Sequence, residues 1–491
     1  MKTLSSVRGP ILGALALCWA LSASALTDEE VFRTFRFNFV NPGGRALAMG
    51  GAFVGIADDA TAAAANPAGL TNLLSPEMFI EIRGAVGTTQ ELSNRVGDPR
   101  LLPGDVLSTS IADPENIVHP SFMSFVKPFD NWVFGLSRQE VLRTDVQTTN
   151  LFVDDGVLPN TNLIRATGRL ETLLEYYNFS VAGSPHEKLA LGATLTYARM
   201  DLESRTANEL ISGSDLEDDY ATSVDDSDDD FAWSLGLLYK PHDKFHIGLV
   251  YRDGPELSFE EMIEDTRPSG NYPSADVLAD FLGNRNLAAG GIGSSSATGG
   301  FNPDSFDDPL TFDNVFNVPD QYGIGFGYRP DDAGHWTIAL DVVNVEYSDL
   351  EEGFVSNVNA LTFPGDAPTC DSGSPMFNGS IPCDYNTPLA TYEFDDAIFW
   401  RLGVEYLWVV KETTPVAIRA GVYVDPNVRL EADFGDQTVF ISTSETFPSG
   451  RDITHYTLGF GLVLQEKFQI DFAADMSNED NTFITSFIYH F

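Results

Sequence analysis

The stretch NTFITSFIYHF, residues 481–491, ends the chain and decides its fold. One set of alternating positions is aromatic or hydroxylated: Phe483, Thr485, Phe487, Tyr489 and Phe491. The intervening positions are Ile484, Ser486, Ile488 and His490. A period of two residues predicts a β-strand whose two faces meet different surroundings. A terminal strand of a soluble sandwich is the alternative, but such a strand rarely exposes so many aromatic rings, so we predict that the aromatic face meets lipid.

The same alternation repeats in earlier segments, for example in residues 400–408, 456–464 and 468–476, with small or polar residues between the apolar ones. It predicts strands near residues 76–88, 119–128, 131–145, 169–183, 188–203, 230–240, 245–258, 316–329, 335–348, 394–410, 415–429, 453–465, 467–477 and 481–491. Their number, fourteen, is even, as bacterial single-chain barrels require. The predicted fold class is all-β, a transmembrane antiparallel β-barrel of about 14 strands.

The connections between these strands sort by length. Short ones lie at residues 127–131, 184–188, 240–244, 330–334, 410–414 and 465–467, and the connections between them are long, up to residues 259–315. Short turns on one side and long loops on the other are typical of outer-membrane barrels, with both termini in the periplasm. Trp132, Trp336 and Trp408 lie beside short turns, where an aromatic girdle is expected.

Residues 1–25 resemble a secretory leader. Lys2 and Arg8 precede or flank an apolar run over residues 11–21, and the small residues of Ala23-Ser24-Ala25 follow it. This pattern predicts cleavage after residue 25 and export. A lipoprotein site at Cys18 is the alternative, which the bulky neighbours of that cysteine disfavour.

The charge excludes one class of partner. The chain has a formal net charge of −44, and the leader contains none of its acids. Phosphates would be repelled, so nucleic acid is excluded as a partner. After the leader, no run of apolar residues is long enough for a helical membrane span.

Residues 26–75 precede the first predicted strand and do not alternate. They include NPGGRALAMGGAF (residues 41–53) and ADDATAAAANPAGL (residues 57–70), which are rich in glycine and alanine. Such a segment has too few large apolar residues for a core of its own, but its backbone can approach a barrel wall closely. We therefore expect a leader at 1–25, a hatch inside the lumen at 26–75, and the barrel at 76–491.

The chain resembles the FadL/TodX family of outer-membrane transporters for hydrophobic compounds. The segment ADDATAAAANPAGL is the specific part, and VPDQYGIGFGYRP (318–330), LDVVNVEYSD (340–349) and LLYKPHDKFHIGLVYR (237–252) are weaker echoes of the family's strands. The resemblance implies a hatch whose Asn-Pro-Ala element, here Asn66, Pro67 and Ala68, lies against the wall; a plain Asn-Pro turn is the other interpretation. The related PorV-like branch is similar too. The terminal Phe487, Tyr489 and Phe491 resemble the signal that the barrel assembly machinery reads.

One long loop contains a candidate helix, SADVLADFLG (residues 274–283). Ser274 is a credible N-cap and Gly283 a credible stop. Its apolar face would hold Val277, Leu278, Phe281 and Leu282. The family resemblance implies that this face captures the ligand; packing of the loop onto the barrel rim is the equal alternative.

Two other loop features are chemical. Residues 215–230 hold nine acids and no base, which predicts a hydrated loop, with divalent cations bridging it to lipopolysaccharide and outer-membrane lipid as the alternative. Cys370 and Cys383 lie in one long loop, and in an oxidising compartment we expect them to form a disulfide worth roughly 3 kcal/mol in the chain-entropy model.

The sequence contains no constellation for catalysis. Its seven histidines lack metal-ligand spacing and no G-x-S-x-G elbow occurs, so we expect no enzyme, cofactor or metal. The leading hypothesis is a passive conduit for hydrophobic small molecules of the long-chain fatty acid, aromatic or aliphatic hydrocarbon class, with a neutral or weakly acidic ligand favoured by the acidic surface. The alternative is a non-transporting scaffold or secretion-complex component resembling PorV. A water-filled porin is disfavoured by the Gly/Ala-rich hatch.

Overall fold

A computed structural model gives the fold of most of the chain. It describes residues 37–86, 90–92, 106–112, 117–153, 163–210, 218–264, 310–331, 333–351, 391–411, 414–428, 431–433, 452–465, 467–478 and 481–491. The leader at 1–25, the candidate helix at 274–283 with Val277, Leu278, Phe281 and Leu282, and the cysteines Cys370 and Cys383 lie outside these residues.

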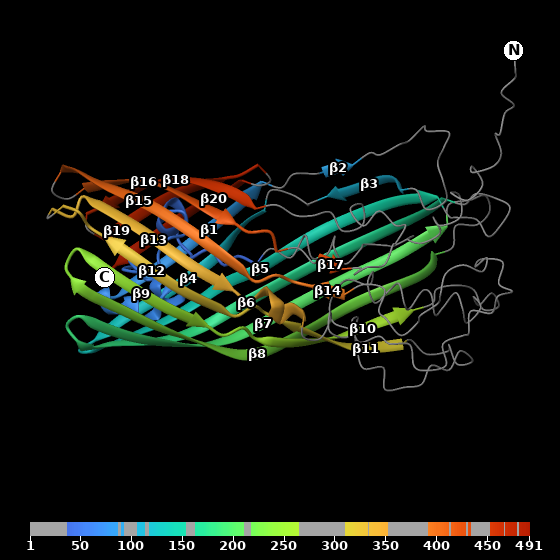
Figure 1. The fold of residues 1–491 in the computed structure, drawn as a ribbon, viewed down its shortest axis with the longest axis horizontal. Helices are drawn as coiled ribbons and strands as arrows, with labels where there is room; N and C mark the ends of the chain where they lie inside the picture. The colour runs from blue at the N-terminus through green and yellow to red at the C-terminus, as the bar shows by residue number, and fades with distance from the viewer. Residues whose placement is uncertain are drawn as a thin grey trace, which may run out of the picture.

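The described residues form a closed antiparallel barrel of fourteen strands (Figure 1). In chain order these are β1 (Glu77–Val86), β4 (Ile117–Phe129), β5 (Trp132–Val153), β6 (Leu163–His186), β7 (Leu189–Leu210), β8 (Asp218–His242), β9 (Phe245–Arg252), β12 (Gln321–Tyr328), β13 (Trp336–Val345), β15 (Ala397–Lys411), β16 (Thr414–Asp425), β18 (Ile453–Leu464), β19 (Phe468–Met476) and β20 (Asn481–His490). The ring closes where β1 pairs with β20, from Glu77 opposite His490 to Val86 opposite Asn481. Each predicted strand corresponds to one of these.

Shorter strands extend the wall at the end with the long loops. They are β2 (Gln90–Leu92) and β3 (Val106–Ala112) beside β5, and β10 (Glu256–Glu264) and β11 (Leu310–Asn317) beyond β9 and β12. A separate pair is formed by β14 (Thr391–Glu393) and β17 (Glu431–Asp433). The wall is therefore taller on the side of β5 to β8.

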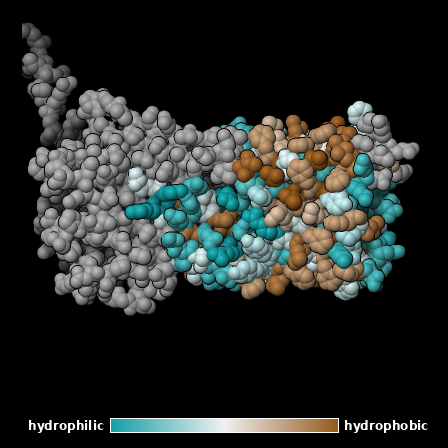
Figure 2. All heavy atoms as spheres, turned by 180° about the vertical axis from the view of Figure 1, so that it is seen from behind, coloured by the Kyte–Doolittle hydropathy of each residue, from teal (hydrophilic) through white to brown (hydrophobic). Residues whose placement is uncertain are grey.

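The alternation predicted from the sequence is confirmed. Phe487 on β20 and Phe491 just after it expose 43% and 60% of their surface, whereas Ile484, Ser486 and Ile488 are buried. Side chains of this outward kind form an apolar band over the half of the barrel next to the short turns, with more polar surface at either side of it (Figure 2). Burial of apolar surface against lipid explains this band.

The short turns and the C-terminus lie together at one end of the barrel (Figure 1). Phe491 there donates its backbone N–H to the carbonyl of Pro76, just before β1. The exposed rings of Trp132, Trp336 and Trp408 lie beside turns at this end, as expected of an aromatic girdle. Among the described residues, no helix has the length and apolar character to cross a membrane.

Two predictions about the wall are wrong: the lengths of the strands β5 to β8, and the assignment of the acidic segment to a loop. Strands β5 to β8 have 22 to 25 residues, several more than predicted at their long-loop ends. The acidic segment 215–230 is not a loop from residue 218 onward, because β8 begins at Asp218. There Asp228 and Asp230 accept hydrogen bonds from the backbone N–H groups of Ser258 and Glu256, at 2.7 and 3.0 Å. These carboxylates bridge β8 to β10, which accounts for acids within a strand.

Candidate functional site

Residues 37–75, which we call the hatch, fill the inside of the barrel. They form α2 (Gly44–Ala48), α3 (Ala62–Ala65) and the 3₁₀ helix η1 (Pro67–Asn72). The hatch contacts opposite parts of the wall, with α2 against β18 and β19 and η1 against β6, β7 and β8. Met49, Phe53, Ile56 and Leu70 are fully buried, so the hatch and the wall share one core.

A belt of inward-facing glycines lets the hatch backbone approach the wall. A Cβ atom at each of these positions would lie less than 3.0 Å from a hatch atom, closer than real Cβ contacts allow. The belt consists of Gly192 on β7, Gly236 on β8, Gly248 on β9, Gly325 on β12, Gly403 on β15, Gly421 on β16 and Gly459 on β18. The missing side chains thus define the shape into which the hatch fits.

Polar wall side chains bind the hatch backbone directly. The Asp341 carboxylate accepts from the N–H groups of Phe53 and Val54, at 2.6 and 2.8 Å. The Thr457 hydroxyl accepts from the N–H of Gly50 at 3.0 Å. The hatch has little regular structure of its own, so these bonds satisfy buried backbone groups that its short helices leave without partners.

A buried ionic chain ties the first half of the hatch to the opposite wall. Arg45 contacts Asp58 within the hatch and pairs with Glu405 on β15 at 2.9 Å. Arg419 pairs with the same Glu405 and with Asp471, both at 2.6 Å. The wall members of this chain are almost fully buried. Removing one of them would leave an uncompensated buried charge, which is strongly destabilising.

Burial also acts on a carboxylate inside the hatch. The pKa of Asp59 is raised to about 7, chiefly by desolvation and also by the nearby Glu77 and Asp58 carboxylates, against the opposing effects of Arg45 and of a hydrogen bond from Thr61. Asp59 accepts from both the backbone N–H and the hydroxyl of Thr61. The residue therefore orders the turn that leads into α3.

The elements predicted from the family resemblance, Asn66, Pro67 and Ala68, lie against the wall as expected. We call them the NPA element. The Asn66 side chain accepts from the N–H of Ala68 at 3.2 Å, which caps η1, while Pro67 occupies the first helical position. The side-chain amide nitrogen of Asn66 donates to the carbonyl of Val54 at 3.0 Å and to that of Leu237 on β8 at 3.2 Å. One side chain thus joins two parts of the hatch to the wall.

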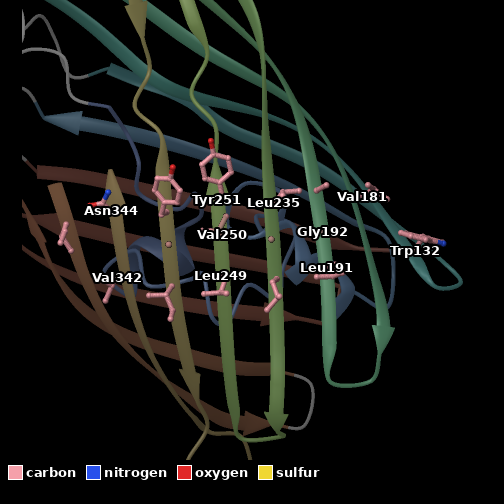
Figure 3. A pocket seen from close by; sticks show the side chains of 17 residues that line it. Trp132, Val181, Leu191, Gly192, Leu235, Leu249, Val250, Tyr251, Val342 and Asn344 are labelled. Atoms are coloured by element: carbon pink, nitrogen blue, oxygen red, sulfur yellow. The ribbon is translucent and has the colours of Figure 1, made fainter. Parts of the chain in front are cut away.

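The outer face of the wall is hollowed at the same place. A cavity of about 920 Å³ extends from β5 to β9 and on across β12, β13 and β15, and is almost entirely apolar (Figure 3). Its lining includes Leu191, Gly192, Ala193, Leu235, Gly236, Leu249, Tyr251, Tyr322 and Asn344. We call it the wall pocket. The hatch ribbon lies behind these strands in Figure 3.

Only glycine backbone separates the wall pocket from the NPA element. Gly192 and Gly236 line the pocket, and on their inner side the nearest atoms belong to Pro67 and Asn66. The strand ladder is intact here: Gly192 pairs with Gly236, and Gly236 pairs with Val250. The wall is therefore closed here, but at Gly192 and Gly236 no side chain stands between the hatch and the wall pocket.

A second apolar region lies inside the barrel above the hatch. It is a cluster of buried side chains that includes Leu174, Met200, Leu257, Phe259, Phe316, Val345 and Phe399. Phe39 of the hatch belongs to the same cluster, and its ring stacks on that of Phe37 with centroids 5.0 Å apart. We call it the lumen cluster. It offers an apolar environment on the long-loop side of the hatch.

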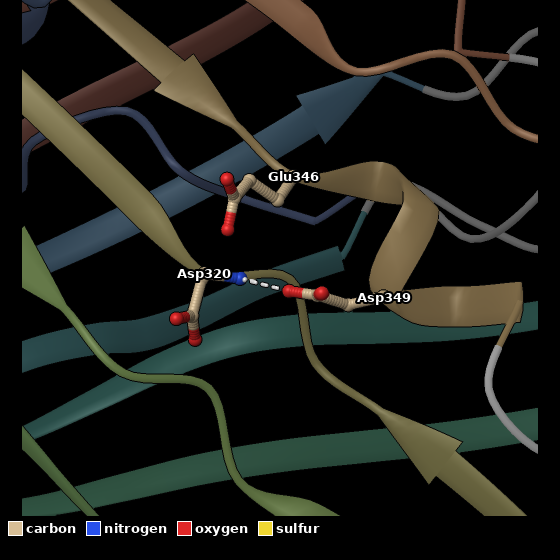
Figure 4. Close-up of side chains that lie close together, drawn as sticks. All are labelled: Asp320, Glu346 and Asp349. Carbon is tan, nitrogen blue, oxygen red and sulfur yellow. Dashed lines mark hydrogen bonds between the residues drawn. The ribbon is translucent and has the colours of Figure 1, made fainter.

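Three carboxylates gather near the long-loop ends of β12 and β13. Oxygens of Asp320, Glu346 and Asp349 lie within 4.8 Å of one another (Figure 4). Asp320 accepts from the Tyr251 hydroxyl and from the Gly254 N–H, both at 2.7 Å, and its own N–H donates to Asp349 at 2.9 Å. Protein donors thus satisfy Asp320, so we assign this group to the folding of the strand ends rather than to a metal.

Sequence reasoning identified the NPA element but not the glycine belt or the wall pocket. The signal for the belt is present, because Gly403 and Gly459 occupy inward positions in clearly alternating strands. The wall pocket has no local signal, since its lining comes from strands far apart in sequence. The terminal Phe487, Tyr489 and Phe491 face outward near the end of β20, consistent with an exposed assembly signal, whose role stays a prediction.

Comparisons with known proteins agree with this geometry. The family described as outer membrane protein transport protein (OMPP1/FadL/TodX) matches residues 25–486. A crystal structure of a Pseudomonas aeruginosa FadL homologue is 14% identical with a TM-score of 0.54, covering 93% of this chain and 99% of its own. The Ralstonia pickettii toluene transporter TbuX is 16% identical with a TM-score of 0.52, covering 92% and 99%. No curated protein sequence matches.

At these identities the two structures show a shared fold and nothing finer. The family match covers almost the whole chain, and its description names transport rather than catalysis, in agreement with the expected absence of an enzyme. The chain belongs to the OMPP1/FadL/TodX family of outer membrane transport proteins.

Proposed function

We propose that the protein conducts hydrophobic small molecules passively across the outer membrane, with exit through the wall under control of the hatch. The class is that of long-chain fatty acids and of aromatic or aliphatic hydrocarbons. Loop capture by Val277, Leu278, Phe281 and Leu282 is part of this proposal. The ligand would pass from the loops into the lumen cluster, and then through the wall into the wall pocket and the lipid.

The observation that carries the proposal is the single layer of glycine backbone between the NPA element and the wall pocket. An apolar molecule leaving here enters lipid directly and never crosses an aqueous layer. This is favourable, because exposing apolar surface to water costs free energy in proportion to its area. Because Gly192 and Gly236 have no side chains, a small movement of Pro67 and Asn66 would uncover the wall from inside. We call the NPA element the gate in this sense.

The test is to fill the wall pocket from the lipid side. Ala193→Trp places a large ring in the pocket without touching the hatch, because Ala193 lines the pocket on its outer face. Ala474→Trp is the matched control, since Ala474 lies on β19, outside the pocket lining, and also faces outward. Uptake of toluene and of oleate is measured in cells that lack their own transporters and express each variant at equal levels.

We expect the wild type and Ala474→Trp to raise uptake equally above cells with an empty vector, and Ala193→Trp to abolish most of that increase. If the wild type adds nothing to uptake, the transport proposal is wrong. If Ala193→Trp transports like the wild type, the ligand leaves by another route.

A further inference from the structure

Arg252, on the inner face of β9, connects the hatch to the wall at several points. Its Nε donates to the carbonyl of Ala64 at 3.2 Å, and its Nη2 donates to that of Ala65 at 2.6 Å. The same Nη2 donates to the Asn41 side chain at 3.2 Å, and Nη1 donates to Gln321 on β12 at 3.1 Å. All three guanidinium nitrogens are therefore used.

The two carbonyls belong to the last turn of α3, immediately before Asn66. A helix leaves its last carbonyls without intrahelical donors, and a cation at this end interacts favourably with them. Arg252 supplies both donors and the charge. Pro67 cannot donate a backbone hydrogen bond, so side chains hold the junction of α3 and η1 to the wall: Arg252 binds the carbonyls of Ala64 and Ala65, and Asn66 binds that of Leu237.

Among the described residues, Arg252 has only neutral acceptors, with no carboxylate in an ion pair with it. Hydrogen bonds between a charged and a neutral group contribute more to stability than those between two neutral groups, but they lack the attraction of a full counter-charge. The hydrogen bonds of Arg252 therefore stabilise the end of α3, and breaking them does not separate two buried opposite charges. The ionic chain through Arg45 and Glu405 holds the other half of the hatch more permanently.

We propose that Arg252 is a positioning residue for the gate: its guanidinium holds the end of α3 and so keeps Asn66, Pro67 and Ala68 against the wall. This inference rests on the proposed function for its meaning in transport. Its structural part, that the Arg252 side chain stabilises residues 60–70 locally, stands or falls independently.

Hydrogen–deuterium exchange of the purified full-length barrel tests the structural part. Arg252→Met keeps an aliphatic side chain of similar length and removes every hydrogen-bond donor. Arg252→Lys keeps the positive charge, on a single nitrogen. Arg329→Met is the matched control, because Arg329 also links wall to hatch, through Asp58 at 2.9 Å, but makes no hydrogen bond or ion pair with the described residues 60–70. Exchange is followed in peptides from residues 60–70 and from β15 to β20.

We expect Arg252→Met to accelerate exchange in residues 60–70 by about 10-fold to 100-fold, as the loss of one or two charged hydrogen bonds implies. Arg252→Lys should give an intermediate value and Arg329→Met the wild-type value. Unchanged exchange in residues 60–70, or equal acceleration in β15 to β20, would overturn the inference, since the second outcome means general destabilisation.

Toluene uptake then tests the link to transport. Arg252→Met should raise the maximal rate and leave the half-saturating concentration unchanged, because the hydrogen bonds of Arg252 go to the hatch and to Gln321 and none goes to the lumen cluster residues named above. A transporting wild type whose maximal rate is not raised by Arg252→Met contradicts the gate assignment. A wild type that transports nothing, with exchange behaving as expected, refutes the proposed function and leaves Arg252 as the anchor of α3.

Discussion

Gly192, Gly236 and Gly248 contribute no side chain to the wall, and the position of the hatch depends on that absence. Atoms of Pro67, Asn66 and Val54 occupy the space that a Cβ would need. Glycine normally weakens a strand, because it has no side chain to pack and loses much backbone freedom. In these strands the loss of stability is offset, because atoms of the hatch pack in the space that side chains would otherwise fill.

Gly236→Ala should therefore destabilise the protein, although alanine is ordinarily better than glycine in a strand. The new Cβ would overlap the side-chain oxygen of Asn66, and overpacking of this kind typically costs about 1–3 kcal/mol. Gly135→Ala on β5 is the control, because its Cβ would meet its nearest atom at an ordinary 3.5 Å. Urea unfolding in detergent should give a lower midpoint for Gly236→Ala than for Gly135→Ala. Equal midpoints would show that the hatch moves away from the new Cβ without loss of stability.

Asp59 gives the hatch a dependence on pH. Burial raises its pKa from 3.8 to about 7, so the folded protein binds this proton more tightly than the unfolded chain does. The contribution of Asp59 to the free energy of unfolding is therefore greatest at low pH and falls as pH rises from about 4 to 7. Asp59→Asn keeps the acceptor for Thr61 and removes the titration. The unfolding midpoint of the wild type should fall relative to this variant over that interval, and parallel curves would contradict the assignment.

At the level of strands, most of the barrel follows from alternation alone. The fourteen strands and the six short turns were predictable because lipid and lumen impose opposite demands on successive residues. The far ends of β5 to β8 were not, because residues 146–153, 163–168, 204–210 and 218–229 show no clear alternation of apolar and polar residues. The acids of β8 look like a loop for the same reason; pairing with β7, and the hydrogen bonds that Ser258 and Glu256 of β10 donate to them, show that they belong to a strand.

The sorting of short and long connections predicts the orientation of the strands in the membrane. Gly334→Cys lies in the turn between β12 and β13, and Asp225→Cys lies exposed on the far half of β8. With Cys370 and Cys383 replaced by serine, a membrane-impermeant maleimide applied to intact cells should label Asp225→Cys and not Gly334→Cys. Both should react after lysis. Labelling of only Gly334→Cys on intact cells would place the termini outside the cell.

At the level of the whole molecule, the candidate site was only partly predictable. The NPA element is local in sequence, so the family resemblance located Asn66, Pro67 and Ala68 directly. The wall pocket and the lumen cluster arise from register, which places Gly192 beside Gly236 and Leu174 beside Met200. Register over such distances depends on closure of the entire ring, and no single segment encodes it.

The charge of the whole molecule predicts its preference among ligands. A chain at −44 repels carboxylates at its surface, although charges beyond about 8 Å are largely screened at physiological salt. We expect faster uptake of an alkylbenzene than of oleate at equal free concentration, with the difference narrowed by added magnesium. Faster oleate uptake that is insensitive to divalent cations would show that surface charge does not select the ligand.

The path through the barrel is tested most directly by a hydrophobic diazirine probe in outer-membrane vesicles, with mass spectrometry of the labelled residues. The account predicts labelling of lumen residues that lipid cannot reach, such as Leu174 and Met200, together with enrichment at Leu235 and Leu249 of the wall pocket over Phe472 on the opposite wall. Ala193→Trp should keep the lumen labels and lose the enrichment at the pocket. Labelling confined to lipid-facing residues, equal at Leu235 and Phe472, would contradict passage through the lumen and the wall.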